Sequence, residues 1–154
     1  MREQDIRNAQ QQWAEALIDI GKVFKKGGDY RKIAGRHIDR LYGYAAGPVL
    51  FKPTLAAVNQ FRTTRKGALS YFVAGDPDYP EDHGFALKPW MQVRFENVAI
   101  SIHGEYGVAM GNYFFISSDG EEIKVEYSFG YFRDCQGELK INLHHSSMPY
   151  RNDH

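Results

Sequence analysis

The stretch "WMQVRFENVAISIH", residues 90–103, decides the fold class, because from Trp90 onward the sequence takes on a period of two. Apolar residues at every second position are typical of a half-buried β-strand. The same character continues in "YGVAMGNYFFISS" (106–118), "EEIKVEYSFGYFR" (121–133) and "ELKINLHHSSMP" (138–149). The turns between these stretches are short and contain Gly and polar residues, as hairpin turns do. The C-terminal half therefore predicts an antiparallel meander of four strands.

The N-terminal half predicts helices. One apolar stripe recurs at steps of four, three and four residues, the period of an amphipathic helix, and it comprises Trp13, Leu17, Ile20 and Phe24. The Gly pair in "KKGGD" (25–29) ends this helix. Asp29 is placed to cap a second helix, whose stripe comprises Ile33, His37, Leu41 and Tyr44.

Three shorter segments connect these helices to the meander. "VLFKPT" (49–54) predicts a short strand, "TRKGALSYFVAG" (64–75) a third helix, and "GDPDYPEDHG" (75–84) an exposed loop. Helices first and meander last predict an α+β fold, with the helices on one face of the sheet. A long sheet that curls round its helices forms a cone with an open mouth. At 154 residues the chain predicts one domain, 1–154, with its core at about residues 10–150.

Composition narrows the function classes. The 19 basic and 19 acidic residues cancel, which argues against a nucleic-acid partner or an anionic membrane surface. Cys135 is the one cysteine in the sequence, so an intrachain disulfide and a Cys-based zinc site are excluded. No apolar stretch approaches the roughly 20 residues of a membrane span, and no signal peptide is visible. We expect a cytoplasmic protein.

The last strand changes its chemistry at its end. Side chains alternate between the two faces of a strand, so one face carries Leu139, Ile141, Leu143, His145 and Ser147. If the aliphatic residues pack against the helices, the side chains of His145 and Ser147 point into the cone, and that of His144 faces solvent or a partner subunit. A histidine on such a face is either a core residue with a satisfied hydrogen bond or a catalytic group.

The sequence predicts no metal site. A metal ion needs three or four converging ligands. His144 and His145 point to opposite faces of a regular strand and cannot reach one ion together. The Asp and Glu residues form no cluster with ligand spacing.

The order of elements and the His-Ser strand end resemble the nuclear transport factor 2-like cone fold, and more narrowly the association domain of calcium/calmodulin-dependent kinase II. The fuller resemblance is to the iota-class carbonic anhydrases, which are marked by a terminal His-His-Ser-Ser. It covers roughly residues 10–150 and rests on "GYAAGPVLFKPT", "FRTTRKGALSYFVAG", "MGNYFF", "KVEYSFGYF" and "LHHSSMP".

This resemblance implies reversible hydration of carbon dioxide in a pocket inside the cone. The family has been described with a metal and without one, so zinc or manganese is the alternative to a metal-free site. In the metal-free description a threonine, a tyrosine, a histidine and a serine hold bicarbonate. These roles fall on Thr54, Tyr71, His145 and Ser147. A neutral His145 would accept a proton from the attacking water, and the hydroxyls would donate to the oxygens that become negative.

Two other functions fit the same fold. One is a non-enzymatic association or small-ligand-binding module. The other is an isomerase or dehydratase, which would need a carboxylate base on an inward strand face, and no Asp or Glu is clearly placed there. The outer face of the meander carries Tyr, Phe and His144 together, a large apolar patch for a monomer, and this predicts a homodimer.

Overall fold

The computed structural model describes residues 1–152, so the last two residues of the predicted 1–154 domain lie outside the described part. The chain forms an α+β fold whose elements follow the predicted order. They are α1 (Glu3–Lys25), α2 (Tyr30–Leu41), β1 (Leu50–Lys52), α3 (Arg65–Val73), the short 3₁₀ helix η1 (Phe85–Leu87), β2 (Trp90–His103), β3 (Tyr106–Ser117), β4 (Glu122–Arg133) and β5 (Leu139–Ser147). In residues 1–152, no helix is both long and apolar enough to cross a membrane.

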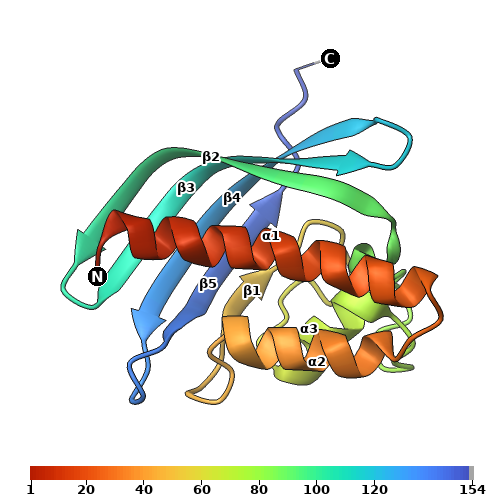
Figure 1. Ribbon diagram of the computed structural model, residues 1–154, viewed down its shortest axis with the longest axis horizontal. Helices are drawn as coiled ribbons and strands as arrows, with labels where there is room; N and C mark the ends of the chain where they lie inside the picture. The colour runs from red at the N-terminus through yellow and green to blue at the C-terminus, as the bar shows by residue number, and fades with distance from the viewer. Residues whose placement is uncertain (153–154) are drawn as a thin grey trace.

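The strands form one sheet in the order β1-β5-β4-β3-β2 (Figure 1). The predicted meander is confirmed, because β2 to β5 pair as antiparallel neighbours. The short strand β1 pairs in parallel with β5, and Lys52 lies in register with His145. Thr54 follows directly after β1, so this pairing brings it to the end of β5.

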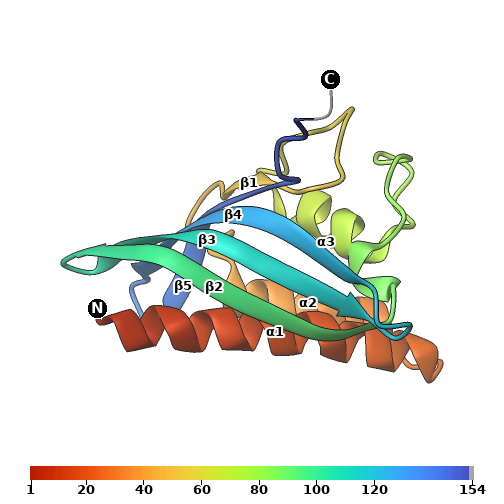
Figure 2. The same ribbon diagram turned by 90° about the horizontal axis from the view of Figure 1, so that it is seen from above.

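Three shifts of register contribute to the curvature of the sheet. Two lie in β2, between Trp90 and Gln92 and between Asn97 and Ala99, and one lies in β5, opposite the pair Gly130 and Tyr131 of β4. A bulge inserts an extra residue, bends the strand and increases its twist. The sheet arches as a result, and α1 lies along its hollow side (Figure 2).

The helices begin where the sequence predicts. The side chain of Asp29 accepts a hydrogen bond from the backbone N–H of Lys32, and Thr64 caps α3 through the N–H of Gly67. Such caps satisfy donors at the start of a helix that have no partner within the helix. The last member of the predicted stripe of α2 is wrong, because α2 ends at Leu41 and Tyr44 lies three residues beyond it.

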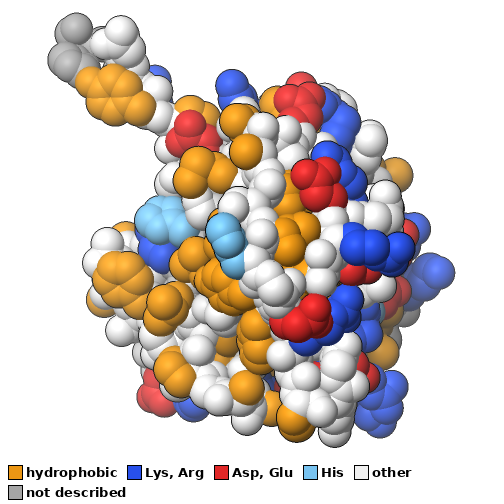
Figure 3. Space-filling view, turned by 90° about the vertical axis from the view of Figure 1, so that its left-hand side faces the viewer, with side chains coloured by type: hydrophobic (Ala, Val, Ile, Leu, Met, Phe, Trp, Pro, Cys, Tyr) orange, Lys and Arg blue, Asp and Glu red, His pale blue; other side chains and the backbone are white. Residues whose placement is uncertain are grey.

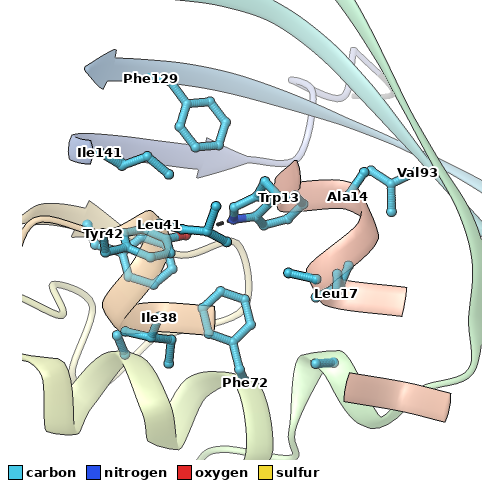
Figure 4. Close-up of a cluster of buried hydrophobic side chains, with 14 of the residues drawn as sticks. Trp13, Ala14, Leu17, Ile38, Leu41, Tyr42, Phe72, Val93, Phe129 and Ile141 are labelled. Carbon is cyan, nitrogen blue, oxygen red and sulfur yellow. Dashed lines mark hydrogen bonds between the residues drawn. The ribbon is translucent and has the colours of Figure 1, made fainter. Parts of the chain in front are cut away.

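The core is largely aromatic and centres on Trp13 of α1 (Figure 4). The indole ring makes edge contacts with Phe72 of α3 and Phe129 of β4, at centroid distances of 6.4 and 6.2 Å. It also stacks on Tyr113 of β3 at 5.7 Å. Each such ring pair is worth about 0.5–1.5 kcal/mol beyond the burial of apolar area. Helix α1 is thus anchored to both the sheet and α3.

The predicted facing of the last strand is wrong at its end. His144 and Ser146 are each 2% exposed, whereas His145 is exposed and Ser147 is only partly buried. The cause is the bulge in β5, where Gly130 pairs with Leu143 but Tyr131 pairs with Ile141. Asn142 is the extra residue, so the side-chain alternation reverses after Ile141. A one-residue shift moves every later side chain to the other face.

Candidate active site

A chain of hydrogen bonds runs through the core from α1 to the sheet. The indole N–H of Trp13 donates to the hydroxyl of Tyr42 at 2.9 Å. The Tyr42 hydroxyl lies 2.8 Å from Nδ1 of His144. On the other side of the imidazole ring, Nε2 lies 3.0 Å from the hydroxyl of Tyr113. Both nitrogens of the buried histidine are therefore engaged.

The chain continues through two small hydroxyls. The hydroxyl of Tyr113 lies 2.5 Å from Oγ of Ser146, and this Oγ lies 2.6 Å from Oγ1 of Thr54. Ser146 follows His144 by two residues on the inward face of β5, and Thr54 comes from the segment after β1. The parallel pairing of β1 with β5 is what makes the last contact possible.

The donors in this chain point in one direction. An indole nitrogen can only donate, so the oxygen of Tyr42 accepts from Trp13. Within residues 1–152, the acceptor for Tyr42's own hydrogen is Nδ1 of His144. The imidazole then carries its hydrogen on Nε2 and donates it to Tyr113. From there the hydroxyl hydrogens point toward Ser146 and Thr54 in turn.

Burial keeps His144 neutral. Its ring is enclosed between Phe129, at a centroid distance of 4.0 Å, and Phe51, at 4.8 Å. Loss of solvation, with a smaller contribution from the charge of neighbouring His145, lowers the pKa of His144 well below its usual value of 6.5. Burial likewise raises the pKa of Tyr42 and Tyr113. At neutral pH every side chain in this chain of hydrogen bonds is therefore uncharged.

Tyr71 of α3 adds a further hydroxyl beside Thr54. Its oxygen accepts the backbone N–H of Leu55 at 3.3 Å. Burial raises the pKa of Tyr71, and hydrogen bonding from Leu55 and from Thr54 opposes this rise. A phenol oxygen that accepts these hydrogen bonds still has its own hydrogen to donate. Tyr71 therefore extends the line of donors by one group.

Thr54 and Tyr71 stand at the boundary between two cavities. A vestibule of about 600 Å³ opens to solvent, and a narrow inner cavity of about 10 Å³ lies behind it, with room for one water molecule. Four residues line both cavities: Thr54, Tyr71, Phe85 and Phe115. The inner cavity is also lined by Ser146, His144 and Tyr113. The hydrogen-bond chain thus ends where the two cavities meet.

A buried ion pair holds the segment that carries these residues. The guanidinium of Arg62 donates to both carboxylate oxygens of Asp82, at 2.8 and 2.7 Å, and both side chains are fully buried. Asp82 also accepts from the hydroxyl of Ser70, one residue before Tyr71. Next to it, Glu81 accepts three backbone N–H groups of the loop 57–59, just beyond Thr54. These contacts fix the Thr54 segment against α3.

The structure brings together part of the predicted site. Thr54 and Tyr71 lie at the inner end of the vestibule, whereas His145 is exposed and Ser147 lies on the outer side of β5. Their neighbours His144 and Ser146 occupy the inward positions. The sequence reading missed Trp13, Tyr42 and Tyr113, because each is indistinguishable from an ordinary core aromatic. A possible signal is that a buried Tyr or Trp needs a partner for its polar atom.

Ionisable groups in the described part of the chain do not form a metal site. In residues 1–152, no three His, Cys, Asp or Glu side chains come together in a way that could hold a metal ion. Both ring nitrogens of His144 are hydrogen-bonded to tyrosines. The carboxylate of Asp82 is paired with Arg62 and accepts a hydrogen bond from Ser70. The chemistry of the site rests on hydroxyls and one neutral imidazole.

Two solved structures share the cone fold at low identity. An association domain of a calcium/calmodulin-dependent protein kinase II type from Xanthomonas campestris is 19% identical, with a TM-score of 0.65 over 97% of this chain and 89% of that one. A dehydratase-like protein of the nuclear transport factor 2-like family from Streptomyces avermitilis is 14% identical, with a TM-score of 0.60 over 96% of each chain. At these identities the likeness concerns the fold alone.

Closer similarity is found among carbonic anhydrases. The metal-independent carbonic anhydrase of Nostoc sp. (strain PCC 7120 / SAG 25.82 / UTEX 2576) is 44% identical over 151 residues, which are 96% of this chain and 74% of the relative. The crystal structure of a cyanobacterial iota-carbonic anhydrase complexed with bicarbonate is 42% identical, with a TM-score of 0.96 over 99% of this chain and 94% of that one. A sequence model of the metal-independent carbonic anhydrases matches residues 4–148. The chain belongs to the metal-independent carbonic anhydrases, the lyases that interconvert carbon dioxide and bicarbonate without a metal ion.

Proposed function

We propose that the chain hydrates carbon dioxide at the boundary between the vestibule and the inner cavity, with Thr54, Tyr71 and Ser146 around the reacting atoms. The observation that carries this proposal is the one-directional chain of hydrogen bonds that begins at Trp13 and ends at this boundary. The bicarbonate bound in the 42% identical cyanobacterial structure supports bicarbonate as the ligand, and we assign the chain to the iota class.

The two cavities suit the two reactants. Carbon dioxide is apolar and can approach through the vestibule, whose walls are mostly apolar. Water is polar and fits the inner cavity, where the hydroxyls of Tyr113 and Ser146 line the wall. Thr54 lines both spaces, and its oxygen has a second lone pair with which it can hold the attacking water. This arrangement places nucleophile and substrate on either side of one residue.

The fixed donors stabilise the charge that develops as bicarbonate forms. When water attacks the carbon, the oxygens of carbon dioxide become negative. Because the oxygen of Tyr71 accepts from Leu55 and Thr54, its own hydrogen can be donated to one of these oxygens. A prearranged donor of this kind lowers the activation barrier by on the order of 3 kcal/mol. Because the chain fixes the donors beforehand, little reorganisation is needed during the reaction.

His144 acts in this scheme as a positioning residue. Its basic lone pair on Nδ1 is bonded to Tyr42, and its lowered pKa makes it a poor proton acceptor. The role of general base expected for His145 is not part of this proposal, because the side chain of His145 is exposed on the outer side of β5. The proton released by the attacking water passes to solvent or buffer in the vestibule. No cofactor is required by this scheme.

Two neighbouring serines give the matched test. We expect Ser146→Ala to lower the rate of carbon dioxide hydration by about 100-fold, because it interrupts the donor chain next to Thr54. Ser147→Ala, on the outer side of the same strand, should stay within about threefold of the wild type. Stopped-flow hydration assays measure both, and activity of both variants should survive treatment with a chelator to the same degree as that of the wild type. Equal rates in the two serine variants would refute the proposed site.

We also propose a homodimer formed through the outer face of the sheet, in a cytoplasmic protein of one domain. Alternation along β3 leaves Met110 on this outer face, 60% exposed, and Val98 of β2 is 79% exposed. Figure 3 views the molecule from the end with the β2–β3 hairpin, and hydrophobic side chains are exposed at this end too, beside histidine and charged side chains. Large apolar side chains exposed together on one face of a sheet are typical of an interaction surface. Sedimentation at micromolar concentration should give twice 17.7 kDa, and a monomer would contradict the proposal.

A further inference from the structure

The vestibule is much larger than the reaction requires. Its volume of about 600 Å³ lies within the range of roughly 300–1,000 Å³ that is usual for pockets that bind small organic molecules. Carbon dioxide would fill only a small part of it. A narrow channel to Thr54 would serve the reaction equally well and would expose less apolar surface to water.

The walls of the vestibule are suited to a hydrocarbon chain. They come from α1, η1, three strands and the segments after β1 and β5, and they include Phe24, Leu55, Phe85, Trp90, Ile123 and Met148. Three of these side chains keep a large exposed fraction: 42% for Phe24, 63% for Leu55 and 51% for Met148. An apolar ligand would remove this surface from water, which is the main source of affinity in such pockets.

The inner end of the vestibule is suited to an anionic oxygen. The chain of donors ends there at Thr54 and Tyr71. The two carboxylates that line the vestibule are compensated. Asp82 is paired with Arg62, and Glu81 accepts three backbone N–H groups and lies 3.7 Å from the same guanidinium. Lys88 at the rim adds a positive charge that lies over the ring of Trp90. A ligand with one negative charge therefore meets no unpaired carboxylate.

We propose that the vestibule binds a medium-chain aliphatic monocarboxylate, with its hydrocarbon chain along the apolar walls and its carboxylate at Thr54 and Tyr71. The placement of the carboxylate rests on the proposed function, since a carboxylate has the same planar pair of oxygens on one carbon as bicarbonate. The placement of the hydrocarbon chain rests on the vestibule alone. Such a ligand would compete with bicarbonate and would couple the activity of the enzyme to the level of the carboxylate.

Direct binding measurements test the hydrocarbon part. Acetate, butanoate, hexanoate and octanoate are titrated by calorimetry and by the fluorescence of Trp90, which lines the vestibule. We expect the affinity to rise by about fourfold for each added methylene group, the factor that burial of one methylene gives. An affinity that does not change with chain length would overturn the proposal.

Two isoleucines provide a matched pair of variants. Ile123 of β4 lines the vestibule, whereas Ile116 of β3 points to the outer face of the sheet, and both are partly buried. Ile123→Glu should weaken octanoate binding at least tenfold, and Ile116→Glu should leave it unchanged. If the two variants bind octanoate with equal affinity, the hydrocarbon chain of the ligand lies outside the vestibule. Circular dichroism confirms that both variants are folded.

The carboxylate part has its own test. Octan-1-ol has the same chain without the charge and should bind at least tenfold more weakly than octanoate. Thr54→Val should weaken octanoate binding by about tenfold while the dependence on chain length persists. If the dependence on chain length persists but Thr54→Val has no effect, the proposed function is wrong about Thr54. If the dependence is lost, the vestibule proposal fails whatever the role of Thr54.

Discussion

Nε2 of His144 lies 3.0 Å from the hydroxyl oxygen of Tyr113, and the two side chains are 2% and 1% exposed. Both side chains are held in the packed core, so the contact fixes the orientation of the tyrosine hydroxyl. Tyr113 in turn lies 2.5 Å from Ser146, beside the inner cavity. The pair connects the core with the hydroxyls of Ser146 and Thr54 at the inner cavity.

The tautomer of His144 follows from this arrangement and can be observed. Nitrogen-15 NMR should show Nδ1 without a hydrogen and Nε2 with one, because Tyr42 donates to Nδ1. Tyr42→Phe removes that donor and should produce a mixture of tautomers. Tyr44→Phe, which removes a hydroxyl bonded to the backbone of Arg62, is the control and should leave the spectrum as in the wild type. A hydrogen on Nδ1 in the wild type would contradict the direction assigned to the hydrogen bonds beyond the fixed donor Trp13.

Stability should depend on pH through His144. Burial lowers its pKa in the folded state well below 6.5, while the unfolded chain keeps a value near 6.5. As the pH falls below about 6.5, the unfolded state takes up the proton first, so the free energy of unfolding decreases by up to about 1.4 kcal/mol per pH unit. The contribution of His144 to the free energy of unfolding is fully present above pH 6.5. It is lost as the pH falls from 6.5 toward the pKa of His144 in the folded state.

Urea unfolding between pH 5 and pH 8 measures this effect. His144→Gln removes the titrating group and should give a shallower decrease of stability below pH 6.5 than the wild type. The account is contradicted if the slope of the His144 variant equals that of the wild type.

The hydroxyls of Thr54 and Tyr71, which we propose as donors to the reacting atoms, should carry most of the rate. Thr54→Val and Tyr71→Phe each remove one hydroxyl and keep the volume, and we expect each to lower kcat by about 100- to 1,000-fold, which corresponds to roughly 3–4 kcal/mol. Thr63→Val changes an exposed threonine and serves as the control.

Stopped-flow assays at several buffer concentrations also show where the proton goes. The wild-type rate should rise with buffer concentration if buffer in the vestibule accepts it.

Substitutions of two arginines allow the stability contributed by a buried ion pair to be compared with that of an exposed one. Arg62 and Asp82 are fully buried, so Arg62→Met leaves a carboxylate without its partner and should cost about 3–5 kcal/mol in urea unfolding. Arg65 makes a similar pair with Asp39, but the two side chains are 47% and 59% exposed. Arg65→Met should therefore cost no more than about 1 kcal/mol. Equal costs would show that Arg62 does not hold the Thr54 segment.

The fold was largely predictable because local signals agree with the global architecture. The helical spacing of Trp13, Leu17 and Ile20, the cap at Asp29 and the hairpin turns all act over a few residues, and each is found where the sequence predicts it. The pairing of β1 with β5 could not be predicted, since residues about 90 positions apart form it and three residues carry no register signal.

The candidate site was predictable only in part. Thr54 and Tyr71 follow from the resemblance, and they lie together at the vestibule. The reversal of His144 and His145 comes from one inserted residue, Asn142, whose bulge depends on pairing with β4 and leaves no mark in the alternation. The role of Tyr113 depends on a contact with β5, a strand that the sequence alone does not place beside it.

The central claim is that the inward histidine holds the donor chain and that its exposed neighbour does not. Hydration of carbon dioxide by His144→Gln and His145→Gln, measured side by side by stopped flow, tests it most directly, with near-ultraviolet circular dichroism to confirm the aromatic core. Misplacing catalytic groups by about 1 Å can lower a rate by about 100-fold, and we expect a loss of this size for His144→Gln. His145→Gln should keep a rate within about threefold of the wild type. A fully active His144 variant, or an inactive His145 variant with an intact core, would contradict the account.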